Sequence, residues 1–217
     1  MTDPVVTIPR SDAKPHARPA LVHQFLIALS GTDPLVWRRI QVPEKYSFWD
    51  LHVAIQDAMG WFDYHLHEFR LLDRSEQHVV SIGIPTDEDP DDRPVIPGWT
   101  VRVSRYFERR AWHAPPALYA YDFGDDWEHV LVHEGMESAE ESITYPRCVS
   151  GARRCPPEDC GGVHGYAEFL RIIANRRHPE YQSTIEWVGG AYDADAFDPR
   201  AVVFDDPRER FKKAFKC

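Results

Sequence analysis

The sequence predicts an α+β fold, in which an antiparallel or mixed sheet built from hairpins carries helices packed on one face. Three observations predict this class. Two pairs of β-type apolar runs are each joined by a short turn containing Gly and Asp, a capped amphipathic segment lies between the pairs, and further helical segments follow. Hairpins with helices grouped on one face are typical of α+β domains. The first elements, in the order ββαβ, also suggest a β-grasp-like start by analogy.

The first hairpin is predicted over residues 23–42. Its strands read HQFLIALS (23–30) and LVWRRIQV (35–42), and the four residues between them, Gly-Thr-Asp-Pro, form a turn signal. Pro43 ends the second strand, because proline is excluded from the interior of a sheet ladder. A four-residue connection fits two antiparallel neighbours.

A helix is predicted from about Phe48 to Met59. Ser47 can cap its start, and Asp50 stands three residues later in the position of a capping box. Gly60 supplies the stop signal. The apolar residues between these signals recur at helical spacing, at Leu51, Ile55, Ala58 and Met59.

Further strands are predicted at 66–72 and 79–84, and the segment 101–108 fits either a strand or a short helix. A second hairpin is predicted from 117–123 and 128–133, with Gly124 in its turn. These strands alternate in the manner of a half-buried sheet.

Two helical segments follow. An amphipathic helix is predicted at 165–174, and Asp198 followed by Pro199 predicts the start of a short helix.

The composition describes one globular domain. The chain has 217 residues, of which 43% are hydrophobic, and no apolar run approaches the roughly 20 residues that a membrane helix needs. We expect a disordered tail at residues 1–20, a single domain at 21–206 and a charged, frayed tail at 207–217. The start of the chain lacks the apolar centre of a secretory signal, so a cytoplasmic location without a membrane partner is expected.

The formal net charge of −10 argues against non-specific binding of nucleic acid, which requires clustered Lys and Arg. Local basic runs occur at 38–39, 102–110 and 153–154. Acidic residues lie close to each run, so all three are interpreted as solvated faces.

A Cys-rich loop is predicted at 145–165. Its potential zinc ligands are spaced Cys-x6-Cys-x4-Cys-x3-His, at Cys148, Cys155, Cys160 and His164. Thiolate and imidazole are ligands that zinc prefers, and four of them are typical of a structural site. Reduced, partly buried thiols and a disulfide are the two alternatives, although a reducing cytoplasm disfavours a disulfide.

A second candidate site combines histidines and aspartates, and it would be a catalytic metal site. His-x-His on a strand places two imidazoles on one face, about 7 Å apart. A nearby hairpin turn could add carboxylates and a third imidazole. The candidate residues are His65, His67, Asp122, Asp125, Asp126 and His129. The alternative is that the histidines pack in the core or lie at the surface while the aspartates shape a tight turn.

Aromatic residues cluster around the same motifs. Aromatic walls with a few polar groups are typical of ligand sites, whereas an aromatic-rich core wall is the alternative interpretation. The candidate ligand-binding residues are Trp37, Trp61, Tyr64, Tyr121 and Trp127.

Several long motifs carry a resemblance to a known family. They read PLVWRRIQVP, LHVAIQDAMGW, HLHEFR, YDFGDDWEH, YPRC and CPPEDCGGVHGYAEFL. From about His23 to about Phe204, the chain resembles the plasmid pRiA4b ORF-3-like family, a domain of unknown function. The resemblance implies a compact α+β domain. Family members are often labelled TnpR-like passenger proteins of insertion elements, but no serine here has the arginine-rich setting of a resolvase nucleophile.

Three functions remain open from the sequence. The favoured one is a binding or adaptor domain for an unidentified protein or small molecule, with a zinc-held loop. The second is a metal-dependent, hydrolase-like enzyme that uses the histidines and aspartates. The third is a DNA-associated accessory protein of a mobile element, which would contact DNA through a local arginine patch.

Overall fold

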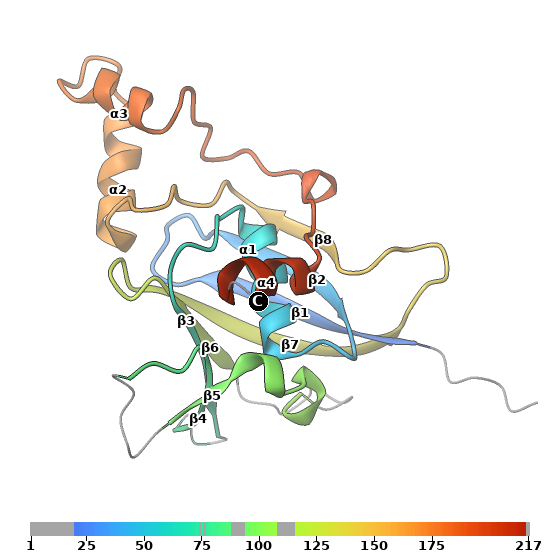
Figure 1. Ribbon diagram of the computed structural model, residues 1–217. Helices are drawn as coiled ribbons and strands as arrows, with labels where there is room; N and C mark the ends of the chain where they lie inside the picture. The colour runs from blue at the N-terminus through green and yellow to red at the C-terminus, as the bar shows by residue number, and fades with distance from the viewer. Residues whose placement is uncertain (1–19, 74, 76, 88–93, 108–115, 216–217) are drawn as a thin grey trace, which may run out of the picture.

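The fold is a mixed α+β architecture built on one large sheet (Figure 1). The computed structural model describes residues 20–73, 75, 77–87, 94–107 and 116–215. Its strands in chain order are β1 (Leu21–Leu29), β2 (Trp37–Pro43), β3 (His67–Leu72), β4 (His78–Gly83), β5 (Val95–Pro97), β6 (Ala117–Tyr121), β7 (Trp127–Ser138) and β8 (Arg147–Ala152). Its helices are α1 (Phe48–Met59), α2 (Gly162–Ile173), α3 (Tyr181–Trp187) and α4 (Pro207–Phe215). Its 3₁₀ turns are η1 (Gly98–Thr100), η2 (Val103–Arg105) and η3 (Pro199–Ala201).

The eight strands form one sheet in the order β5-β4-β3-β6-β7-β1-β2-β8. Every neighbouring pair is antiparallel except β4 and β5, which are parallel. Both predicted hairpins are confirmed, as β1–β2 and β6–β7. The β-grasp-like start is not confirmed, because β1 pairs with β2 and β7 while β3 lies between β4 and β6.

Helix α1 begins and ends where the sequence signals place it. Ser47 Oγ accepts a hydrogen bond from the Asp50 amide at 3.2 Å, and the Asp50 carboxylate accepts one from the Ser47 amide at 2.8 Å. Gly60 caps the other end with φ of 91°, a left-handed conformation that suits glycine. The helix buries most of its residues, including Leu51 and Ile55, in the core of the domain.

The chain beyond residue 95 holds elements that the sequence did not indicate. Strand β8 lies inside the predicted loop 145–165 and extends the sheet beside β2. Strand β5 and helix α3 also form, and the undecided segment 101–108 contains η2. Figure 1 shows that α2 and α3 project away from the sheet at the upper left, as an arm.

The expectation of a frayed tail from residue 207 is wrong for 207–215, because this segment forms helix α4. Phe211 and Phe215 place their rings 5.5 Å from that of Trp49 on α1. The Trp49 indole also donates a hydrogen bond to the Pro207 carbonyl at 2.9 Å. Burial of these aromatic faces against α1 offsets the weak helix propensity of a short charged segment. Within the described residues, no helix is both long and apolar enough to cross a membrane.

Arg210 joins α4 to the rest of the domain through three carboxylates. Its guanidinium lies 2.6 Å from Asp57 on α1, 2.7 Å from Asp205 and 3.4 Å from Asp63. Asp57 and Asp63 are largely buried, with side-chain exposures of 6% and 9%. Loss of the arginine would therefore leave two poorly solvated carboxylates without their cation.

We expect Arg210→Gln to lower the free energy of unfolding by about 2–3 kcal/mol, measured by urea denaturation. The matched control is Arg208→Gln on the same helix, because Arg208 pairs with Asp206 in an exposed setting. That control should leave the stability close to that of the native chain, because water screens an exposed ion pair. Equal losses in both variants would contradict a structural role for the buried ion-pair network.

Candidate functional site

One histidine and two aspartates meet at the surface where β3 begins and β6 ends. His65 precedes β3, Asp122 follows β6, and Asp159 lies in the loop before α2. The His65 Nε2 atom is 3.2 Å from Asp159 Oδ1 and 3.5 Å from Asp122 Oδ2. Their ligand atoms all lie within 4.8 Å of one another, a spacing that could hold a metal ion. We call these three residues the His–Asp cluster.

The β6–β7 turn fixes the position of Asp122. Its φ of 55° is left-handed, a conformation that aspartate tolerates better than most residues. Its Oδ1 atom accepts hydrogen bonds from the amides of Gly124 and Asp125, at 3.1 and 3.3 Å. These local bonds occupy Oδ1, and the other oxygen, Oδ2, is the one that approaches His65.

The same turn is clamped against the loop that carries Asp159. The Gly161 amide donates a hydrogen bond to the Asp125 carboxylate at 2.9 Å. Gly162 has φ of 66°, and a Cβ atom there would stand 2.3 Å from the Asp125 carbonyl oxygen. Only glycine permits this close approach, which brings two distant segments of the chain together at the cluster.

A fourth acidic residue, Glu158, lies next to the cluster. Its carboxylate accepts hydrogen bonds from the Phe62 amide at 2.7 Å and from the Tyr121 hydroxyl at 3.1 Å, and it lies 4.0 Å from His65 Nε2. Burial raises the pKa of Glu158 above its ordinary value.

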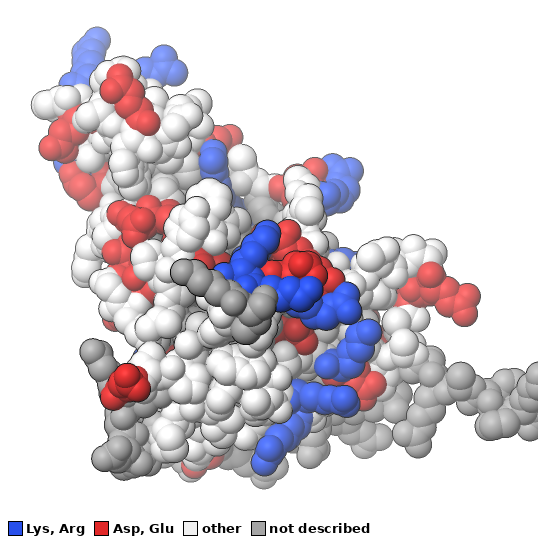
Figure 2. Space-filling model, in the orientation of Figure 1, with Lys and Arg blue, Asp and Glu red and all other residues white. Residues whose placement is uncertain are grey.

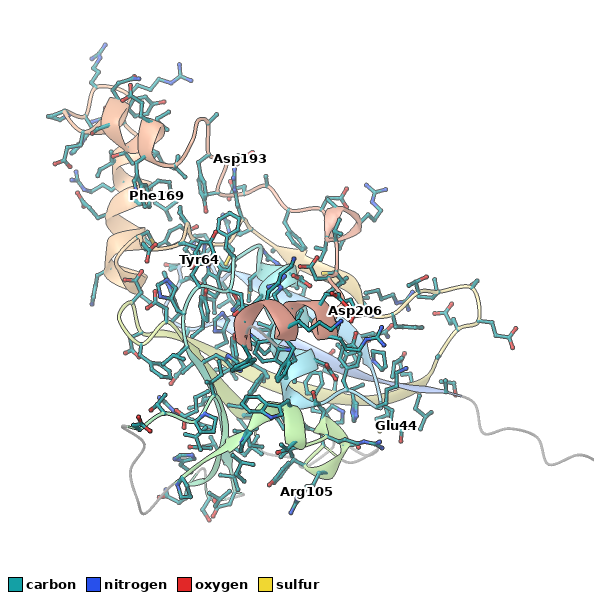
Figure 3. The ribbon with its side chains drawn as sticks, in the orientation of Figure 1. Glu44, Tyr64, Arg105, Phe169, Asp193 and Asp206 are labelled. Atoms are coloured by element: carbon teal, nitrogen blue, oxygen red, sulfur yellow. The ribbon has the colours of Figure 1, made fainter. Side chains whose placement is uncertain are left out.

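The cluster opens to solvent beside exposed aromatic rings. The Asp159 side chain is 68% exposed and that of His65 is 28% exposed, whereas Asp122 is largely buried. Phe62 and Tyr64 are both exposed, with ring centroids 5.5 Å apart. Figure 3 places Tyr64 near the base of α2, and Figure 2 shows acidic side chains on this side of the molecule.

The structure separates the other predicted histidines from this cluster. Strand β3 begins at His67, so His65 does not share a strand face with it as predicted. His67 is buried, and its ring stacks on that of His52 with centroids 3.5 Å apart. His129 is also buried, 3.1 Å from the Tyr119 carbonyl oxygen. Within the described residues, neither histidine belongs to a group of three possible metal ligands.

Of the predicted aspartates, Asp125 and Asp126 shape the turn. The Asp125 carboxylate accepts a hydrogen bond from the Gly161 amide, and the Asp126 backbone amide donates one to the Asp122 carbonyl at 2.7 Å. Asp159, which the sequence prediction missed, completes the cluster. It lies well beyond the predicted hairpin, which ends at residue 133, and no spacing rule relates it to His65.

The predicted aromatic residues fall into two groups. Trp61, Tyr121 and Trp127 are buried, with ring centroids 5.0 Å and 5.9 Å apart around Trp61, and they form a core wall. Tyr64 is exposed beside the cluster, and Trp37 is half-buried on β2. The core-wall interpretation therefore describes the first three, and Tyr64 remains a candidate for ligand contact.

The four predicted zinc ligands are spread along β8, the following loop and α2. Cys148, Cys155 and Cys160 are free thiols, and burial raises the pKa of Cys148 to about 11 and that of Cys160 to about 12. His164 is exposed on α2. Among the described residues, no three of these four ligands lie within 4.8 Å of one another. Zinc binding by this loop stays a prediction.

The basic runs differ in their surroundings. Arg38 is 1% exposed, so the interpretation of a solvated face is wrong for this residue. Arg39 pairs with Glu134 at 2.7 Å, and Arg153 pairs with Asp195. Arg102 and Arg105 are exposed, as predicted, and residues 108–110 lie outside the described residues.

Fold and site together define an α+β domain with a surface cluster of potential metal ligands. The chain belongs to the plasmid pRiA4b ORF-3-like family, whose model matches residues 21–201. It is 36% identical over 178 residues to the uncharacterized protein y4hQ of Sinorhizobium fredii (strain NBRC 101917 / NGR234), covering 82% of this chain and 86% of that protein.

A solved structure shows the same fold. The crystal structure of MM3350, a protein of unknown function from Methanosarcina mazei Go1, is similar with a TM-score of 0.76 and 39% sequence identity. The match covers 85% of this chain and 99% of that chain. The predicted family membership is confirmed, while the link to insertion elements stays a prediction.

Proposed function

We propose that this chain is a metal-dependent binding domain that recognises its ligand through a divalent transition-metal ion at the His–Asp cluster. The supporting observation is the approach of three ligand atoms from three separate segments to within 4.8 Å of one another. One imidazole and two carboxylates suit Zn²⁺ or Mn²⁺. Three protein ligands leave coordination positions open for an oxygen or nitrogen atom of a bound partner.

The surroundings favour this cluster over the second group of potential ligands, Glu168, His178 and Glu180. In that group, Arg171 lies 2.5 Å from the Glu168 carboxylate and 3.2 Å from the His178 ring. The guanidinium thus neutralises a ligand and occupies the space that a cation would need. At the His–Asp cluster, the described residues place no Lys or Arg within ion-pair distance of Asp122 or Asp159.

Binding rather than catalysis is proposed because the described site supplies one histidine instead of three. His67 and His129, which a hydrolytic centre would have drawn on, are buried in the core. The exposed rings of Phe62 and Tyr64 offer apolar contact area next to the metal, as in many ligand sites.

Isothermal titration calorimetry with Zn²⁺ and Mn²⁺ tests the proposal. We expect about one ion per chain for at least one metal, and His65→Ala should weaken its binding by at least about 10-fold, because the imidazole is a direct ligand. Asp159→Asn should weaken it as well, and its exposed side chain makes a folding defect unexpected.

The matched control is His178→Ala, which removes the histidine of the other group. It should leave the affinity unchanged, and all variants should keep the circular dichroism spectrum of the native chain. Metal binding that survives His65→Ala at full strength, or that is lost in His178→Ala, would contradict the assignment.

A further inference from the structure

A cleft of about 510 Å³ lies between the end of α1 and the segment that follows α3. Its volume is in the range of small-molecule sites, roughly 300–1,000 Å³. The side chains that matter for its chemistry are Trp61, Phe62, Arg154, Glu158, Trp187 and Tyr192. Phe62 and Glu158 also adjoin the His–Asp cluster, so the two sites are neighbours.

Arg154 is a positioned cation in this cleft. Its guanidinium lies over the Tyr192 ring, 4.6 Å from the centroid. Tyr192 is itself fixed, because its hydroxyl donates a hydrogen bond to the Cys155 carbonyl at 2.8 Å and its ring packs edge-on against Phe169 with centroids 4.9 Å apart. Figure 3 shows Phe169 on α2, partway along the arm.

The charge of Arg154 is not neutralised within the described part of the chain. No carboxylate there lies within ion-pair distance of its guanidinium, whereas the adjacent Arg153 pairs with Asp195. Glu158 lines the same cleft, but its carboxylate accepts hydrogen bonds from the Phe62 amide and the Tyr121 hydroxyl. An exposed arginine with no anion partner beside a cleft is suited to an acidic group on a ligand.

Trp187 gives the cleft a flat apolar surface. Trp187 is 53% exposed at the end of α3, and its ring is 6.1 Å from Phe169, which holds it at the edge of the arm. Trp61 also lines the cleft, and its indole donates a hydrogen bond to the Pro156 carbonyl at 2.9 Å. A planar ring would therefore meet aromatic surface while its substituent approaches the guanidinium.

We propose that this cleft binds a small planar aromatic acid, whose anionic group pairs with Arg154 and whose ring lies against Trp187. The inference goes beyond the proposed function, because neither contact involves the metal. The ligand class is defined by one negative charge attached directly to an aromatic ring system.

The test compares 2-naphthoate with its uncharged analogue 2-naphthamide, by calorimetry on the full chain in buffer containing EDTA. The native chain should bind 2-naphthoate at least about 10-fold more tightly than the amide, as a charge-assisted pair predicts. Arg154→Gln should remove that preference, and Trp187→Ala should weaken both probes to a similar extent. Chelation of metal makes the result independent of the His–Asp cluster.

Arg153→Gln is the matched control, since it removes an adjacent, already paired guanidinium and should leave the preference intact. Thermal melts of all variants check that the fold is retained. Equal affinity for the two probes, no binding of either, or equal loss in Arg153→Gln and Arg154→Gln would overturn the proposal.

Discussion

Replacement of Arg38 by methionine is expected to lower the free energy of unfolding by about 3–5 kcal/mol. Arg38 is 1% exposed, and its guanidinium donates hydrogen bonds to the carbonyl oxygens of Ala58 at 2.8 Å, Trp37 at 2.8 Å and Ala152 at 3.0 Å. It also lies 3.7 Å from the centroid of the Phe197 ring. Methionine fills part of the volume but donates nothing, so three carbonyl oxygens lose a donor together.

Chemical denaturation measures this effect, and Arg39→Gln is its control. Arg39 neighbours Arg38 on β2, but it pairs with Glu134 near the surface, where an ion pair contributes less than about 1 kcal/mol. Arg38→Lys should also be destabilising, because a single ammonium group cannot reproduce the branched guanidinium hydrogen bonds that join α1, β2 and β8. A loss in Arg38→Met no greater than in Arg39→Gln would show that the three carbonyl bonds contribute little.

The second large effect is a loss of stability in mild acid, to which His129 contributes. Burial lowers the pKa of His129 from 6.5 to about 4. Between these values the unfolded chain binds a proton that the folded chain excludes, so the free energy of unfolding falls as the pH falls. The full difference corresponds to about 3 kcal/mol, reached near pH 4 and absent above pH 6.5.

His129→Phe isolates this contribution. Phenylalanine keeps an aromatic ring between Trp61 and Tyr119, whose rings are 5.3 and 5.2 Å from that of His129, but it cannot take up a proton. At pH 7 the free energy of unfolding of the variant should be lower by about 1 kcal/mol, because the hydrogen bond to the Tyr119 carbonyl is lost. At pH 4.5 it should be more stable than the native chain.

Urea denaturation across pH 4–8 measures the crossing of the two stability curves. The control is His164→Gln, because His164 is exposed on α2 and its variant should follow the native curve. Parallel curves for the native chain and His129→Phe would mean that His129 titrates alike in both states. Burial also lowers the pKa values of His23 and His133 to about 4. The stability of His129→Phe should therefore still fall in acid, but less steeply than that of the native chain.

Elements with strong local signals were predictable from the sequence. Helix α1 follows from a capping box at Ser47 and Asp50 and a stop at Gly60, signals that act within a few residues. The two hairpins follow from alternating apolar residues and short turns. In each case the interactions that decide the structure lie close together along the chain.

Other elements depend on distant partners, and local patterns could not reveal them. Helix α4 is charged, and it is stabilised by contacts with residues of α1 such as Trp49 and Asp57, roughly 150 residues earlier in the chain. Strand β8 lies in a segment rich in Gly and Pro, a composition that does not predict a strand. It forms because its backbone pairs with that of β2.

The candidate site shows the same division. His65 and Asp122 were predicted because motifs of histidine and aspartate surround them, and Asp159 was not, because only the folded chain brings its loop to β3. The three predicted histidines do not converge, because His67 and His129 are buried in the core. A two-residue periodicity identifies the two faces of a strand, but it does not say which face meets the solvent.

The pairing of β1 with β7 also has a consequence for synthesis. Residues 21–29 form a central strand, but one of its two neighbours ends at residue 138, so the nascent chain lacks that partner until more than 100 further residues have been made. At roughly 5–20 residues per second, this delay is on the order of ten seconds. Throughout that time the edge of the N-terminal hairpin that β7 will cover stays open, and an open strand edge is a place where another chain can pair.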